Sequence, residues 1–141
     1  MPTAPTELPA APLPDPHART LLVTLNGPDR PGVTKALFEA ASTVGADVLD
    51  LEQVVVRGHL ALSLLLSPGR DENVLVDRLT RTGSRLGMRV DLEVGHGDNA
   101  PRRTGRAAVV VMGAPLETQH IAAVAAAIAE HGANIDRIRR L

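Results

Sequence analysis

The sequence predicts an α+β domain followed by a partial second copy of the same unit. Short apolar runs alternate with segments whose apolar residues recur at helical spacing. Turns rich in glycine and proline separate these segments. The pattern then restarts, since Val109 opens a run that matches the one at Leu22, 87 positions earlier. Together these three observations predict the fold class.

The first two predicted elements are a buried strand and a helix. Residues 21–25 form a short apolar run typical of a buried strand, and the run stops at a turn-forming cluster over residues 26–32. A helix follows, because six apolar residues then fall on one face at helical spacing: Val33, Ala36, Leu37, Ala40, Ala41 and Val44. Gly45 stands just past its end, where a left-handed cap is favoured.

A hairpin is predicted next. Residues 46–57 are typical of a strand and include a β-branched run at 54–56. Residues 60–66 form a second apolar strand. Only Gly58 and His59 separate the two, which favours a tight antiparallel turn between them.

A second helix and a fourth strand complete the unit. The pattern predicts a helix over residues 71–86, with Gly83 weakening its C-terminal half and Gly87 ending it. Residues 88–94 alternate apolar and charged side chains, as a half-buried strand does. The order β-α-β-β-α-β over residues 19–95 is the ferredoxin-like arrangement, an antiparallel four-stranded sheet with both helices on one face.

The flanks of this unit have a different composition. Residues 1–18 hold six of the eleven prolines, which fix φ and remove amide donors. They predict a disordered, proline-rich leader. Residues 96–106 are polar and rich in glycine and arginine, and they predict a linker.

Residues 107–141 are predicted to be an incomplete second copy. Gly132-Ala133-Asn134-Ile135 lies at the same 87-residue offset from Gly45-Ala46-Asp47-Val48, and an apolar helix face precedes it. The copy reaches only into its second strand, so its first strand, predicted at residues 107–112, would lack both central neighbours. We therefore expect a fragment of a longer protein, or a paired or swapped oligomer. A frayed second half is the alternative.

Composition argues against several function classes. The 15 Lys and Arg balance 16 Asp and Glu, so no duplex nucleic acid or anionic membrane is predicted as a partner. The chain has no Cys, Trp or Tyr, which excludes disulfides and aromatic stacking platforms. The five His show no metal-ligand spacing. No apolar run is long enough for a membrane helix, and a signal peptide pattern is missing, so a cytoplasmic location is expected.

The strand-to-helix turn at residues 26–33 is the candidate binding site. Pro31 presets φ for the first helical turn, and Gly32 lets a ligand approach the backbone closely. The amides and the positive end of the helix suit a carboxylate, while Asp29 suits an ammonium or a hydroxyl. The two ends of an α-amino acid would fit. The alternative is a purely structural turn in which Asp29 is the helix N-cap.

These residues resemble an ACT domain, the small ferredoxin-like module that senses amino acids. The resemblance rests on residues 21–33 and 45–56. The doubled arrangement, with Asp29-Arg30-Pro31-Gly32, residues 51–57 and Gly132-Ala133-Asn134-Ile135-Asp136, is similar to the tandem ACT region that begins actinobacterial-type phosphoserine phosphatases. It covers residues 19–141.

The resemblance implies a ligand, L-serine or a related amino acid, bound between two ACT copies, and a homodimer through ACT–ACT pairing. Asp29 and Gly32 would hold the ligand from one side, and Asn134 from the second copy, within the chain or across a dimer. The predicted ligand-binding residues are Asn26, Asp29, Arg30, Pro31, Gly32, Val33, Asn134 and Ile135. No cofactor or metal is implied.

The second copy departs from this pattern. Leu116-Glu117-Thr118-Gln119 stands where Asp29-Arg30-Pro31-Gly32 stands in the first copy, so a matching second site is not expected. The Asp-x-Asp-x-Thr nucleophile motif of these phosphatases does not occur either, and no catalytic residue is predicted. A longer parent would be a phosphoserine phosphatase with serine as its effector. A ligand-independent dimerisation module and the ACT part of another enzyme, such as a formyltetrahydrofolate deformylase, are the alternatives.

Overall fold

A computed structural model describes residues 15–97, 105 and 107–140 of the chain. The greater part of the predicted leader and of the predicted linker lies outside these residues. The chain divides into two compact units, residues 1–101 and 102–141, and each is described by itself.

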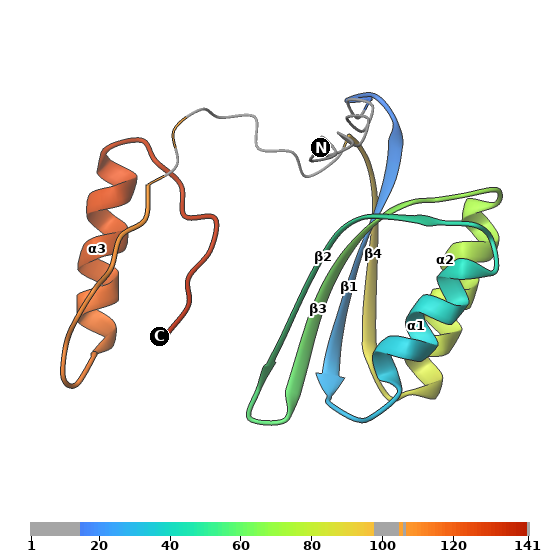
Figure 1. Ribbon diagram of the computed structural model, residues 1–141, viewed down its shortest axis with the longest axis horizontal. Coiled ribbons are helices and arrows are strands. Elements are labelled where there is room, and N and C mark those ends of the chain that lie inside the picture. Colours follow the sequence, from blue (N-terminus) through green and yellow to red (C-terminus); the bar gives the residue numbers. More distant parts are fainter. Residues whose placement is uncertain (1–14, 98–104, 106, 141) are drawn as a thin grey trace, which may run out of the picture. The chain divides into compact units, whose positions relative to one another are not determined.

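The first unit is a four-stranded antiparallel sheet with two helices on one face (Figure 1). Its elements are β1 (Arg19–Pro28), α1 (Val33–Ser42), β2 (Asp47–Val56), β3 (His59–Ser67), α2 (Glu72–Arg85) and β4 (Arg89–His96). The strand order is β2-β3-β1-β4, so β2 and β4 are the edges. The predicted ferredoxin-like α+β arrangement is confirmed.

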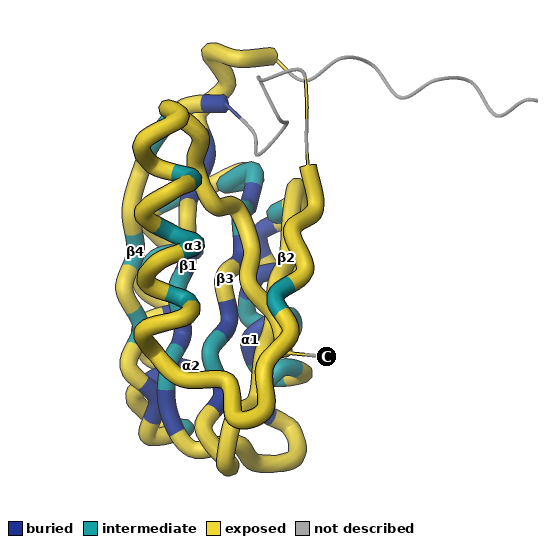
Figure 2. Tube along the Cα trace, turned by 90° about the vertical axis from the view of Figure 1, so that its left-hand side faces the viewer, coloured by how far each residue is buried: buried dark blue, intermediate teal, exposed yellow. Residues whose placement is uncertain are grey.

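The core lies between the two central strands and the helices. Leu21, Val23 and Leu25 of β1 pair with alternate leucines of β3, and all of them face the helices. Each has at most 2% of its surface exposed. The two-residue period of a strand sends the residues between them to the other face, which no helix of this unit covers (Figure 2).

Strand β1 is longer than predicted. The expected turn at Asn26, Gly27 and Pro28 is still paired, opposite Ala61, Leu60 and His59 of β3. Proline is tolerated at the end of a strand, where a missing donor costs little. A Cβ at Gly27 would lie 2.5 Å from Sδ of Met88, so a larger residue there would force that side chain to move.

Gly83, which was predicted to weaken the C-terminal half of α2, lies inside the helix and packs against the sheet. Gly83 is buried, and a Cβ at this position would collide with the side chain of Val90 in β4. The glycine therefore lets the helix approach the sheet, a packing role that its low helix propensity does not reveal. At the other end of α2, the Asp71 carboxylate caps the helix by accepting from the amide of Val74 at 3.1 Å.

The second unit contains one regular element in its described part, α3 (Thr118–Glu130). The helix was predicted. The strand predicted at residues 107–112 is absent among the described residues of this unit. Val110 and Met112 are 68% and 91% exposed, and no residue of α3 is buried. A strand needs a neighbour for its hydrogen bonds, and none is present there, whereas a helix forms its own.

Candidate functional site

The turn between β1 and α1 is fixed at the end of the sheet. The amide of Asp29 donates to the carbonyl of Gly58 at 2.8 Å, which joins this turn to the β2–β3 turn. Arg57 and Gly58 form that second turn with φ of 50° and 74°, both in the left-handed region. Two loops far apart in sequence are therefore held together beside the first turn of α1.

Helix α1 begins without a side-chain cap. Its N-cap is Gly32, in the left-handed region at φ 92°, and no side chain accepts from the first turn. A Cβ at Gly32 would meet nothing within 4 Å, so the space beside this residue is open. The amides of Thr34 and Lys35 have no carbonyl one turn earlier in the helix. They point, with the positive end of the helix dipole, to where an anion would sit.

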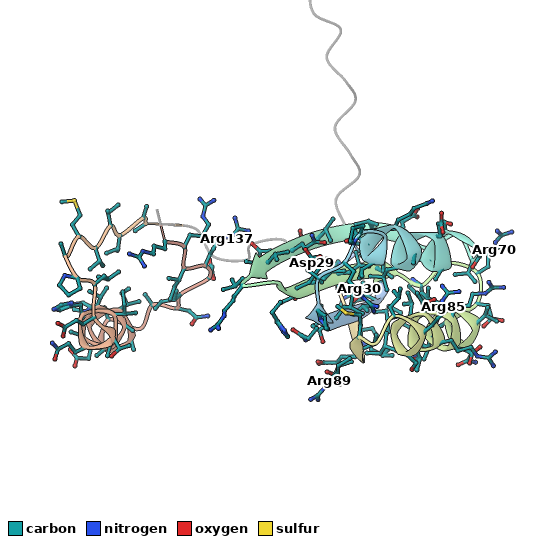
Figure 3. The ribbon with its side chains drawn as sticks, turned by 90° about the horizontal axis from the view of Figure 1, so that it is seen from below. Asp29, Arg30, Arg70, Arg85, Arg89 and Arg137 are labelled. Carbon is teal, nitrogen blue, oxygen red and sulfur yellow. The ribbon has the colours of Figure 1, made fainter. Side chains whose placement is uncertain are left out.

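Two charged side chains flank this helix end. Asp29 and Arg30 are both exposed in the turn. Both are labelled in Figure 3, which views the unit from the end that carries this turn. In the described part of the chain the Asp29 carboxylate has no hydrogen bond or ion pair. The guanidinium of Arg30 extends toward Gly87, since a Cβ built there would lie 3.6 Å from its Nη2. The alternative prediction that Asp29 caps α1 is wrong, because Gly32 occupies that position.

A residue that sequence reasoning missed also reaches the site. The hydroxyl of Thr34 donates to Oε1 of Gln53 in β2 at 2.9 Å. Strict alternation from Val48 would place Gln53 on the other face of the sheet. A bulge at Leu49 shifts the register, so Gln53 pairs with Leu62 and faces the helices. A bulge has no strong sequence signature, and the residue could not have been assigned from the pattern.

The predicted site residues differ in what they can offer. Asp29, Arg30, Pro31 and Gly32 are exposed together in the turn. The side chain of Val33 is 1% exposed and belongs to the core, so it can contribute only backbone.

The other three predicted site residues lie outside this turn. Asn26 pairs with Ala61, and its side chain lies on the face away from the helices. Asn134 and Ile135 belong to the second unit, where they follow α3 as exposed residues.

The start of α3 is built differently from the start of α1. Its N-cap is Glu117, whose amide donates to Nδ1 of His120 at 3.1 Å. The Glu117 carboxylate accepts from Nε2 of Gln119 at 2.6 Å. A carboxylate already stands at this helix end, so it does not offer an anion the open approach that α1 offers.

The β1–α1 turn of the first unit, residues 29–32, is an exposed surface and not a pocket, and it is called the shelf below. Two hollows of that unit lie elsewhere, one on the helix-free face of the sheet and one between the outer sides of α1 and α2. A small molecule on the shelf would be covered from one side only, whereas binding sites bury most of their ligand. A complete site needs a second wall.

The described residues show neither a metal-binding cluster nor a membrane-spanning helix. No cluster of three or more His, Asp or Glu that could hold a metal ion occurs among them. None of the helices described is both long enough and apolar enough to cross a membrane.

Comparison with known proteins identifies the family. An ACT domain model matches residues 19–93, and a second ACT domain model matches residues 106–141. The chain belongs to the ACT domain family. It carries two ACT segments in tandem, as the resemblance implied, with the second one partial in its described fold.

Two curated relatives are phosphoserine phosphatases. The Streptomyces coelicolor enzyme is 44% identical over 124 residues, which is 86% of this chain. Phosphoserine phosphatase SerB2 of Mycobacterium tuberculosis is 37% identical over 125 residues, which is 85% of this chain. In both cases the match spans 30% of the relative's length.

A solved structure supports the fold alone. It is named for a glycine cleavage system transcriptional repressor and superposes with a TM-score of 0.52 at 18% identity. The superposition covers 59% of this chain and 49% of that one.

Proposed function

We propose that this ACT module binds a free amino acid, L-serine, and uses it as a regulatory signal. The observation that carries the proposal is one turn that offers both an uncapped helix end and the exposed carboxylate of Asp29. An α-amino acid bears a carboxylate and an ammonium on neighbouring atoms. The helix end suits the first group and Asp29 the second.

The second wall of the site is proposed to come from another ACT copy. Asn134 is suited to this role, because its carboxamide can donate to a carboxylate and accept from an ammonium. Ile135 would stand next to it. The module would accordingly act as a homodimer through ACT–ACT pairing, which is consistent with the one-sided shelf on the first unit.

Serine is favoured among amino acids by the relatives. Both curated matches are phosphoserine phosphatases, and removal of phosphate from phosphoserine yields serine. A product that binds a separate module and changes the packing of two copies can alter the state of an attached enzyme. In a longer protein this module would regulate such a phosphatase in the cytoplasm. Residues 19–95 and 107–141 would be the two ACT segments.

Calorimetry with matched variants tests the binding proposal. L-serine titrated into the chain should give saturable heat, with weaker responses to glycine and L-alanine. Asp29→Asn should weaken binding at least about tenfold, because it removes the charge that meets the ammonium. Asp91→Asn, an exposed carboxylate on the helix-free face of β4, should bind as the unmodified chain does. Equal loss in both variants would contradict the assignment of Asp29.

A second candidate function is a ligand-independent interaction module. The observation in its favour is the exposed edge strand β2, all ten residues of which are exposed. A chain that is folded, associates with itself and gives no heat with any of the three amino acids would support this function and exclude the first.

A further inference from the structure

The turn between β2 and β3 holds an arginine in a backbone conformation that arginine rarely adopts. Val56 of β2 pairs with His59 of β3, so Arg57 and Gly58 alone connect the two strands. Their φ values, 50° and 74°, are both positive, which is the pattern of a type I′ turn. Among the described residues, Arg57 is the only non-glycine residue with positive φ. The arginine therefore occupies a position that favours asparagine or glycine.

The conformation of Arg57 is unfavourable, and no contact within the fold explains it. A side chain in the left-handed region brings its Cβ too close to the backbone carbonyl oxygen. In the part of the chain that the structure describes, the guanidinium has no hydrogen bond or ion pair to offset this. Arg57 is also exposed and does not belong to the core. Residues held in such conformations cluster at binding and catalytic sites.

This turn lies directly beside the shelf. The carbonyl of Gly58, the residue after Arg57, accepts from the amide of Asp29 at 2.8 Å. The Asp29 carboxylate is exposed as well, and it forms no ion pair with Arg57 or with any other described residue. Two loops joined by a hydrogen bond thus carry opposite charges that do not neutralise each other. Such an arrangement is complementary to a zwitterion, which carries both charges close together.

We propose that Arg57 binds the α-carboxylate of the amino acid, while Asp29 binds its ammonium group. This assignment rests on the proposed function and names the residue that selects a free carboxylate. A guanidinium offers two parallel N–H donors, which match the two oxygens of a carboxylate. The open amides of Thr34 and Lys35 at the start of α1 can donate to the same group.

Binding accounts for an arginine where the turn itself favours another residue. Asparagine would relieve the backbone but would bring no charge, and lysine would bring the charge without the two-donor fork. The two-residue turn and the hydrogen bond from Asp29 also fix the backbone that carries the guanidinium, which lowers the entropy lost on binding. Stability and binding should therefore favour different residues at this position.

Substitution of Arg57 tests the assignment through opposite effects on two properties. Arg57→Asn should raise the melting temperature slightly, because asparagine suits the left-handed conformation. The same variant should weaken L-serine binding in calorimetry at least about tenfold, because it removes a charge-assisted pair. Arg57→Lys should weaken binding less, since the charge remains. Arg78→Asn, which removes an exposed arginine on the outer side of α2, should bind L-serine as the unmodified chain does.

L-Serinamide identifies the part of the ligand that Arg57 contacts, because it keeps the ammonium and the hydroxyl but has no carboxylate. The unmodified chain should bind L-serine more tightly than serinamide. Arg57→Asn should bind serinamide within about twofold of the unmodified chain, so that most of the preference for serine is lost. Asp29→Asn should instead weaken the binding of both compounds, since both carry the ammonium.

Three results would overturn the assignment of Arg57 and leave the proposed function standing. The first is unchanged L-serine binding in Arg57→Asn, which would place Arg57 outside the site. The second is an equal loss for serine and serinamide, which would show that Arg57 acts through the shape of the turn. The third is a lower melting temperature of Arg57→Asn, which would show that the fold itself needs the arginine.

The proposed function fails by a different result. If the unmodified chain, with a well-dispersed amide spectrum, gives no saturable heat with L-serine, the amino acid site is removed and the assignment of Arg57 with it.

Discussion

The two copies of the repeat differ most at their first strands. Val23 and Leu25 of the first copy are completely buried, whereas their counterparts Val110 and Met112 are 68% and 91% exposed. Both copies nevertheless form the helix that follows. A helix closes its hydrogen bonds within the segment, but a strand must find its partners elsewhere in the chain. An apolar pattern in a strand therefore predicts burial correctly only when the neighbouring strands are also present.

The two helix starts differ in a way that bears on binding. Helix α1 begins at a glycine with no side-chain cap, beside an exposed aspartate. Helix α3 begins at Glu117, whose own carboxylate and neighbours occupy that end. The first start leaves its amides without a side-chain partner, whereas the second has a carboxylate in front of it. Of the two helix starts, only that of α1 therefore has an open turn. We expect substitutions in that turn to affect binding more than substitutions at the start of α3.

The largest expected difference is in stability between equivalent core positions. Leu37→Ala empties a site that is completely buried and should lower the free energy of unfolding by about 2–5 kcal/mol. Val124→Ala at the equivalent place in α3 should cost less than about 1 kcal/mol, because that side chain is only half-buried. Urea unfolding of the full chain, followed by circular dichroism, measures both. Equal losses would show that the second unit has a packed core of its own.

A smaller effect is expected where α2 meets the sheet. Gly83→Ala should destabilise the chain by about 1–3 kcal/mol, since the added methyl group collides with Val90. Gly95→Ala is the matched control, because a Cβ at that strand position meets nothing within 4 Å. The same unfolding experiment compares them. If Gly83→Ala were stabilising, low helix propensity and not packing would be the dominant property of that glycine.

The capped and uncapped helix starts make a further test. Asp71→Ala removes the bond to the amide of Val74 and should cost about 1 kcal/mol. Asp71→Asn keeps an acceptor and should cost clearly less. No counterpart of this loss exists at α1, where Gly32 offers no side chain. A cost shared equally by both Asp71 variants would mean that its charge, and not its cap, stabilises α2.

The smallest expected effect is a pH dependence at the surface. The side-chain hydrogen bond to Arg19 lowers the pKa of Glu72, and the same bond raises the pKa of Arg19. A carboxyl with a lowered folded pKa stabilises the fold above its unfolded pKa of about 4.3, and the gain is lost as pH falls through the folded value. Glu72→Gln should therefore lower the melting temperature slightly at pH 7. At acidic pH the melting temperatures of Glu72→Gln and of the unmodified chain should become equal.

Much of the first unit could be predicted from residues alone. All six elements were assigned in order, because strand and helix periods are local properties of the sequence. The extension of β1 to Pro28 was not predicted, because glycine and proline usually end a strand. Here both residues are still paired with β3. The packing role of Gly83 depends on Val90, which only the folded chain places beside it.

The candidate site was also predicted only in part, because some of its features are local in sequence and others depend on the fold. The turn and its helix dipole follow from the order strand, Pro31, Gly32, helix. The contribution of Gln53 depends on a bulge that reverses the faces of β2, and the inward position of Val33 depends on the core. Asn134 and Ile135 remain predictions, as does the identity of the ligand.

The most direct test of the central claim is an amide shift titration of ¹⁵N-labelled chain with L-serine. The chain has no Trp or Tyr for fluorescence, so the backbone amides are a suitable probe. The account predicts saturable shifts at residues 29–35 and near Asn134, with no shift at residues 117–120, and loss of all of them in Asp29→Asn. Shifts confined to other parts of the sheet, or a well-dispersed spectrum that does not change up to millimolar serine, would contradict it.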